Sequence, residues 1–142
     1  MKTFKQYIKE EIKPEDFWRS KPKDPYQHVA HNSVVDGHIL SVKFINSHKG
    51  TKNYDVHYDV NGESDKESSK VVDPKTQVRI GMRVKSVVAA FHRHFGPSSI
   101  TAMAADKDPA IRQKKHKFNT HFIQKLNPKK MTAKGNVTTG YF

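Results

Sequence analysis

The chain contains no cysteine among its 142 residues. A disulfide framework and a thiolate metal site are therefore excluded. No apolar run approaches the roughly 18 residues that a membrane span needs, and the N-terminus lacks the apolar core of a secretory signal. The sequence predicts a protein that is made and kept in a reducing cytoplasm, or in something assembled there, without contact with membranes.

Acidic residues are nearly missing from the second half of the chain. Residues 1–74 hold 12 basic and 12 acidic side chains, whereas residues 75–142 hold 14 basic side chains and two acidic ones, Asp106 and Asp108. The formal net charge of +12 therefore lies wholly in the second half. A concentrated basic surface attracts phosphate through counterion release, without reading a base sequence. The pattern favours a surface that binds polyanions; the alternative is a solvated basic face.

The first residues carry the pattern of a short amphipathic helix. A capping box that begins at Thr3, followed by apolar residues at helical spacing, predicts a helix over residues 3–12. Residues 13–25 contain three prolines and a charged stretch, which is typical of a linker. Residues 1–25 are therefore expected to be a leader helix and a Pro-rich linker. The alternative is an ordinary amphipathic helix that packs on the domain.

The opening sequence MKTFKQYIKE resembles the capsid-targeting leader of the internal head proteins of T-even-type contractile-tailed bacteriophages. In that family the leader carries a small basic protein into the prohead, and the maturation protease cuts after Leu or Ile, any residue, then Glu. The resemblance implies a processing site at Ile8 and Glu10. It also implies phage head proteins as partners, a location beside DNA in the capsid interior of the virion, and later delivery to the host cytoplasm. Some such proteins then disarm host defences.

The middle of the chain alternates apolar and polar residues, as half-buried strands do. The alternation predicts strands over residues 38–46 and 54–60. Asn61-Gly62 then predicts a tight turn, because both residue types tolerate positive φ. A third strand is expected within residues 63–72. A turn at Asp73-Pro74 should follow, with a short strand at Val78 and Ile80.

Helical periodicity follows Gly81. Five apolar side chains of residues 82–95 fall on one face and predict a helix, which Gly96-Pro97 ends. Residues 99–105 are small and apolar, and this composition is typical of a buried strand.

A second helix is expected after a cap at Asp106 or Asp108, and it ends before Pro128. The element order predicts one α+β domain over residues 26–128, with a small antiparallel sheet and two helices packed on one of its faces. Residues 129–142 are expected to form a basic flexible tail.

The sequence contains no clear catalytic or metal-binding pattern. The close histidine pairs have spacings that make poor metal signatures, namely His28 and His31, His92 and His94, and His116 and His121. Asp55, His57 and Asp59 share one strand face and could bind a cation, but the polar outer face of a half-buried strand is the favoured interpretation. We expect no enzyme, no metal and no cofactor. The strand, helix, strand order is similar to that of small acetyltransferases, which leaves a further alternative based on topology alone.

Basic residues of the second helix give the clearest functional prediction. Most of them lie beside or away from the apolar stripe, where they can reach solvent. The predicted nucleic-acid-binding residues are Arg93, Arg112, Lys114, Lys115, Lys117, Lys125, Lys129 and Lys130. This surface would bind DNA non-specifically through its phosphates. The alternative partner is an acidic protein surface, for instance a host enzyme or a neighbouring virion protein.

Overall fold

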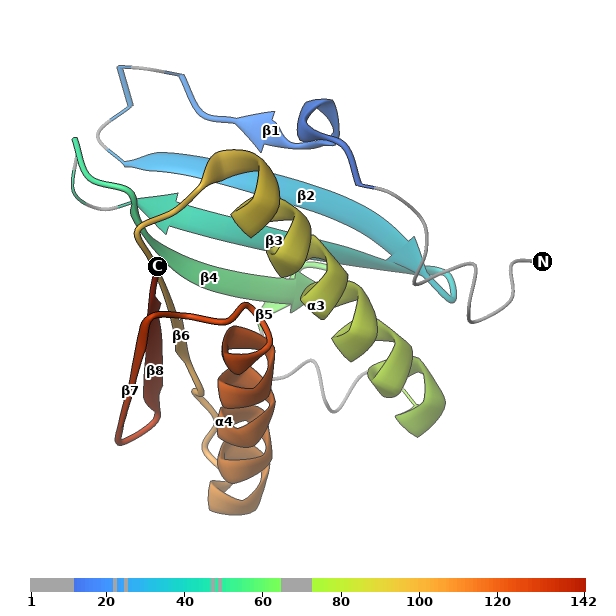
Figure 1. Ribbon diagram of the computed structural model, residues 1–142. Coiled ribbons are helices and arrows are strands. Elements are labelled where there is room, and N and C mark those ends of the chain that lie inside the picture. The colour runs from blue at the N-terminus through green and yellow to red at the C-terminus, as the bar shows by residue number, and fades with distance from the viewer. Residues whose placement is uncertain (1–11, 22, 25, 47, 49, 65–72) are drawn as a thin grey trace.

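The computed structural model describes residues 12–21, 23–24, 26–46, 48, 50–64 and 73–142. In these ranges two helices lie over one face of an eight-stranded sheet (Figure 1). The predicted α+β class is confirmed, whereas the sheet is larger than the small one expected. No helix in the described ranges is both long and apolar enough to cross a membrane.

The strands lie in the order β1-β2-β3-β4-β6-β8-β7, with the short β5 beside β4. Their bounds are Trp18–Arg19 (β1), Gln27–Val35 (β2), His38–Asn46 (β3), Asn53–Val60 (β4), Glu63–Ser64 (β5), Ser99–Met103 (β6), Lys130–Lys134 (β7) and Val137–Tyr141 (β8). β4 and β6 pair in parallel, so the prediction of a wholly antiparallel sheet was wrong. Helix α3 (Pro74–Phe95) connects these two strands. A helical crossover of this kind returns the chain in the same direction.

Strand β2 was not predicted, although it pairs with β3 along its whole length. A tight turn joins the two strands, with φ of 49° at Asp36 and 80° at Gly37. Positive φ at both central residues is a geometry that suits the twist of a hairpin. The polar residues His31 and Ser33 are buried on the face of β2 that packs against the helices. They break the apolar alternation by which a strand is recognised.

The other central strands and their turn agree with the sequence. β3 and β4 occupy the predicted ranges, and Asn61-Gly62 forms the predicted turn with φ of 54° and 81°. β5 provides the start of the expected third strand. Residues 65–72, where the rest of that strand was placed, lie outside the described residues.

Helix α3 begins at Pro74, earlier than predicted. The carboxylate of Asp73 accepts a hydrogen bond of 3.0 Å from the backbone N–H of Thr76, which caps the helix. The Asp-Pro pair that was interpreted as a turn is therefore an N-cap followed by proline at the first helical position. Val78 and Ile80 are helical, so the short strand predicted there was wrong.

The remaining helix boundaries are confirmed. Gly96 ends α3 in the left-handed conformation, with φ of 57°. The carboxylate of Asp108 accepts a hydrogen bond of 2.9 Å from the N–H of Ala110 and caps helix α4 (Pro109–Gln124).

The core lies between the sheet and the two helices. Leu40, Val42 and Phe44 alternate along β3 and are fully buried on this face. Phe91 of α3 stacks on Phe44, with ring centroids 3.8 Å apart. Ile123 of α4 is also fully buried in the same cluster. Both helices therefore share one core with the sheet.

The segment predicted to be a linker contributes to this core. Ile12 and Phe17 are buried, and the Phe17 ring lies 5.3 Å from that of Phe95 in α3. A single turn of 3₁₀ helix (Pro14–Asp16) precedes Phe17, and β1 then pairs with β2. The packed unit thus begins before the predicted boundary at residue 26. Residues 1–11, with the predicted leader helix and the processing residues Ile8 and Glu10, lie outside the described residues.

Residues 129–142 form a hairpin rather than a flexible tail. β7 and β8 are antiparallel and are joined at Gly135, which has φ of 61°. Thr138 is fully buried beneath α4, where its hydroxyl lies 3.0 Å from that of Thr120. Gly140 lies so close to the helix that an added Cβ would be 2.6 Å from the Ile123 side chain. Helix α4 therefore orders the C-terminal segment.

Candidate nucleic-acid interface

Helices α3 and α4 contain no acidic residue between them. Both cover the same face of the sheet (Figure 1), so the solvent-facing sides of the two helices belong to one side of the molecule. We call the outer surface of these helices the helical face, and we include Lys125, which caps the end of α4. The basic residues within the helices are Lys75, Arg79, Arg83, Lys85 and Arg93 in α3, and Arg112, Lys114, Lys115 and Lys117 in α4.

A direct contact joins the two helices. The Nζ atom of Lys85 lies 3.0 Å from Nδ1 of His121 and 5.4 Å from the centre of the Phe118 ring. An ammonium group can only donate, so the imidazole nitrogen of His121 is the acceptor. Phe118 also packs near Gly81, where a Cβ atom would be 3.3 Å from its ring. The basic surfaces of α3 and α4 are therefore continuous at this point.

Helix α4 presents a row of lysines to solvent, with His121 among them. Lys114, Lys117, His121 and Lys125 follow one another at spacings of three or four residues, which places them on one side of the helix. All four are exposed. The ammonium groups of Lys114, Lys117 and Lys125 make no ion pair with any of the described residues. These three charges are available to an incoming polyanion.

Two of the predicted binding residues instead surround Asp106. The Nζ atom of Lys115 lies 3.2 Å from a carboxylate oxygen of Asp106, and both side chains are buried. Arg112 is half-buried and donates from its guanidinium to the backbone oxygen of Asp106 at 3.3 Å. Removing one partner of a buried ion pair leaves the other charge uncompensated. Lys115 is therefore a structural residue, and we leave it out of the interface.

The remaining predicted residues do not form one patch with α4. Lys130 lies in β7 and pairs with Tyr141, whose ring centre is 6.0 Å from its Nζ atom. Strand register places both residues on the sheet face opposite the helices, which we call the open face. Lys129 is exposed just before β7, and Arg93 is exposed in the last turn of α3. Only Arg93 of these residues belongs to the helical face.

Sequence reasoning missed the basic residues in the first turns of α3. Lys75 is exposed and has no ion pair among the described residues. Arg79 contacts the carboxylate of Asp36 at 2.7 Å, and this hydrogen bond lowers the pKa of Asp36. Arg79 is therefore engaged by an acid of its own chain. The signal that could have found Lys75 is the Asp73-Pro74 pair, which marks a helix start as well as a turn.

A polar chain beneath α3 links Arg83 to His31 of β2. The Nε group of Arg83 donates to the Ser33 hydroxyl at 3.0 Å, and that hydroxyl lies 3.1 Å from Nδ1 of His31. Burial is the main cause that lowers the pKa of His31, and the charge of Arg83 lowers it further. The charge of Asp16 acts in the opposite direction and raises it. The fold therefore favours a neutral imidazole at His31.

Because the fold lowers the pKa of His31, the free energy of unfolding is expected to fall as the pH drops below about 6.5, the ordinary pKa of histidine. A lowered folded-state pKa means that the unfolded chain binds more protons between the two pKa values, so acidification favours unfolding there. His31→Gln should reduce this dependence by up to about 1.4 kcal/mol per pH unit. Urea denaturation at several pH values between about 5 and 7, analysed as a two-state transition, measures the slope of the free energy of unfolding against pH.

A matched control for that experiment is His57→Gln, which removes an exposed imidazole on the open face. It should leave the slope unchanged. Burial also lowers the pKa of His92, so some pH dependence should remain in the His31 variant. Identical slopes for wild type and His31→Gln would contradict the role assigned to His31.

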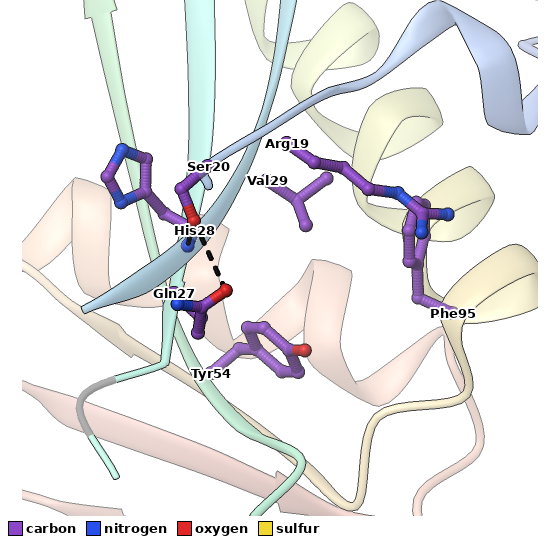
Figure 2. Close-up of a pocket in the computed structure, with 7 residues that line it drawn as sticks. All are labelled: Arg19, Ser20, Gln27, His28, Val29, Tyr54 and Phe95. Carbon is purple, nitrogen blue, oxygen red and sulfur yellow. Dashed lines mark hydrogen bonds between the residues drawn. The ribbon is translucent and has the colours of Figure 1, made fainter. Parts of the chain in front are cut away.

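A cavity of about 290 Å³ lies beside the C-terminal end of α3 (Figure 2). Its walls come from β1, β2, β4 and the end of α3, and they are Arg19, Ser20, Gln27, His28, Val29, Tyr54 and Phe95. The guanidinium carbon of Arg19 lies 4.6 Å above the Phe95 ring. The Ser20 hydroxyl accepts a hydrogen bond from the N–H of His28, and the His28 ring lies against Trp18. The Ser20 hydroxyl is thus held by the His28 backbone and lies 3.5 Å from the Gln27 side-chain oxygen.

The acidic and histidine residues of β4 lie on the open face. Asp55 and His57 are exposed, and Asp59 is half-buried. Across the described ranges, no group of three His, Asp or Glu side chains is arranged to hold a metal ion. The triplet thus has the arrangement expected of a polar outer face.

The chain matches no known family model, no curated protein and no solved structure.

Proposed function

We propose that this chain is an internal protein of a bacteriophage virion that binds DNA non-specifically through its phosphates. The observation that carries the proposal is the helical face, where two adjacent helices present cations and contain no acidic residue. The binding residues are Lys114, Lys117 and Lys125 of α4, with Lys75 and Arg93 of α3. Electrostatic contacts of this kind supply nearly all of non-specific DNA affinity.

The chemistry of the helical face favours phosphate over base edges. Four of the five side chains are lysines, whose ammonium groups are compact point charges on flexible stems. Base recognition in contrast needs side chains that a docked helix or strand holds in a groove against the base edges. Lysine contacts with phosphates position a protein on the duplex but carry no sequence information.

Both helix N-termini argue against a cofactor that carries phosphate groups, as an acetyltransferase would need. Phosphates bind at helix N-termini because free N–H groups point at them. In α3 and α4 a proline occupies the first helical position and an aspartate occupies the cap. Proline has no N–H group to donate. Asp73 already accepts from the N–H of Thr76 and Asp108 from that of Ala110, and both carboxylates would repel a phosphate. We therefore favour a binding protein over that alternative.

DNA binding by the wild-type chain should depend steeply on salt and hardly at all on base sequence. Three to five phosphate contacts predict a slope of log K against log salt between about −2.7 and −4.5. Affinity should therefore fall roughly 40-fold to 500-fold between about 50 and 200 mM salt. Fluorescence anisotropy with two duplexes of unrelated sequence measures both properties. A flat salt response, or a strong preference for one duplex, would overturn the DNA proposal.

The location in the virion rests on the leader resemblance and has its own test. If the chain is packaged and processed after Glu10, mass spectrometry of purified virions should find it with Glu11 as the first residue. Glu10→Ala should abolish that form without affecting the folded core. Absence of the chain from purified heads would overturn packaging, and an intact Met1 or Lys2 terminus would overturn cleavage only. Neither result would change the prediction for DNA binding.

A further inference from the structure

Strand β7 forms one edge of the sheet and is exposed along its whole length. Its inner edge pairs with β8, and no described strand pairs with its outer edge. In an antiparallel pair a strand directs only part of its N–H and C=O groups toward its neighbour. The outer edge of β7 therefore presents backbone groups that an additional strand could pair with.

The side chains of β7 differ between its two faces. Lys130, Thr132 and Lys134 pair with Tyr141, Thr139 and Val137, so they project from the open face. Met131 and Ala133 project from the opposite face and are exposed, whereas α4 packs over the neighbouring β8. An added strand would meet two cations on one side and two small or flexible apolar groups on the other.

A second copy of the chain is a poor occupant of this edge. Antiparallel pairing of two β7 strands about Thr132 would place Lys130 of each copy opposite Lys134 of the other. Like charges directly opposite each other destabilise a strand pair. Such a repulsion would occur at both ends of the paired strands. The charges therefore favour a partner other than a second copy of the chain.

We propose that β7 binds an extended acidic segment of another protein as an additional strand of the sheet. Carboxylates spaced four residues apart would lie opposite Lys130 and Lys134, where opposite charges stabilise a cross-strand pair. Apolar residues at the alternate positions would lie against Met131 and Ala133. Backbone hydrogen bonds supply the affinity, and the two lysines supply the selectivity.

This site is separate from the proposed DNA interface. Strand register places Lys130 and Lys134 on the open face, whereas the lysines of α4 lie on the helical face. A DNA duplex offers no extended peptide backbone to pair with a strand edge. Loss of one activity therefore need not accompany loss of the other.

The test uses the full chain and a short fluorescent peptide in which Val alternates with Glu, Thr and Glu. A second peptide carries Lys in place of Glu. The wild-type chain should bind the Glu peptide at least about tenfold more tightly than the Lys peptide. Lys130→Glu together with Lys134→Glu should reverse this preference. Hydrogen exchange followed by NMR should show alternate amides of β7 becoming protected when the Glu peptide binds.

The double variant Lys114→Glu with Lys117→Glu is the matched control, because it changes the net charge by the same amount but on the helical face. It should leave binding of the Glu peptide unchanged while it weakens DNA binding. If both double variants lose affinity for the Glu peptide equally, the peptide is attracted by the overall charge of the chain, and the proposal is overturned. Peptide binding without protection of β7, or no binding at all, would overturn it too. In the last case the lysines only guard the edge against aggregation.

Discussion

Replacement of Lys114, Lys117 and Lys125 together by Gln is expected to weaken DNA binding by roughly 500-fold at about 0.1 M salt. Each lysine that contacts a phosphate contributes about 0.9 to the slope of log K against log salt, so the slope should flatten by about 2.7. The three side chains are exposed and make no ion pair with the described residues. Their loss should thus change the free energy of unfolding by less than about 0.5 kcal/mol. Anisotropy over a salt series and thermal unfolding measure the two quantities.

The matched control removes the same charge from the open face. Lys43, Lys130 and Lys134 are exposed there, and replacing all three by Gln lowers the net charge equally. DNA binding by this variant should stay within a few-fold of wild type, because long-range charge effects are screened at about 0.1 M salt. If both triple variants lose affinity equally, binding follows net charge and the helical face is not the site.

The sequence was most informative where side-chain periodicity and end signals agree. Helix α4 has an aspartate cap, a proline start and exposed lysines at helical spacing, and Asp108 is one of the two caps predicted for it. Strands β3 and β4 alternate clearly and were also predicted. Each of these elements buries one face of its own, so its pattern is visible without knowledge of its neighbours.

The missed elements depend on neighbours that are distant in the sequence. Ile12 and Phe17 stand alone in a charged stretch, and only their contact with the distant helix α3 makes them core residues. In the C-terminal hairpin, Thr138 and Gly140 are buried under α4, although neither residue type indicates a core position. Such positions are set by tertiary packing rather than by local preference.

The predicted binding residues lie in different places in the structure for the same reason: tertiary packing sets their positions. Lys115 and Asp106 are nine positions apart, and one lies in a helix while the other precedes it. Their buried ion pair depends on how the chain enters α4, which no spacing rule reveals. Lys130 was grouped with the lysines of α4 because it is near them in sequence, but strand register sends it to the other face.

Phe91→Ala is expected to lower the free energy of unfolding by about 3 to 5 kcal/mol. The ring is fully buried, stacks on Phe44 and Phe95, and meets Tyr54 edge-on at 5.0 Å. Its removal deletes apolar contacts on three sides, and a stacked ring cannot readily move into the space that is left. The melting temperature should fall by roughly 10 to 20 °C for a chain of this size.

A matched control lies on the same helix. Val78→Ala shortens an apolar side chain that is 61% exposed, so it should change stability by less than about 0.5 kcal/mol. Phe91→Leu keeps most of the buried volume and should fall between the two, which keeps the comparison usable if the Ala variant does not fold. Since total stability is only about 5 to 15 kcal/mol, the loss at Phe91 should also expose the chain to proteolysis. A Phe91→Ala variant as stable as Val78→Ala would mean that α3 does not pack on β3 through this ring, and the helical face would lose the support that positions it.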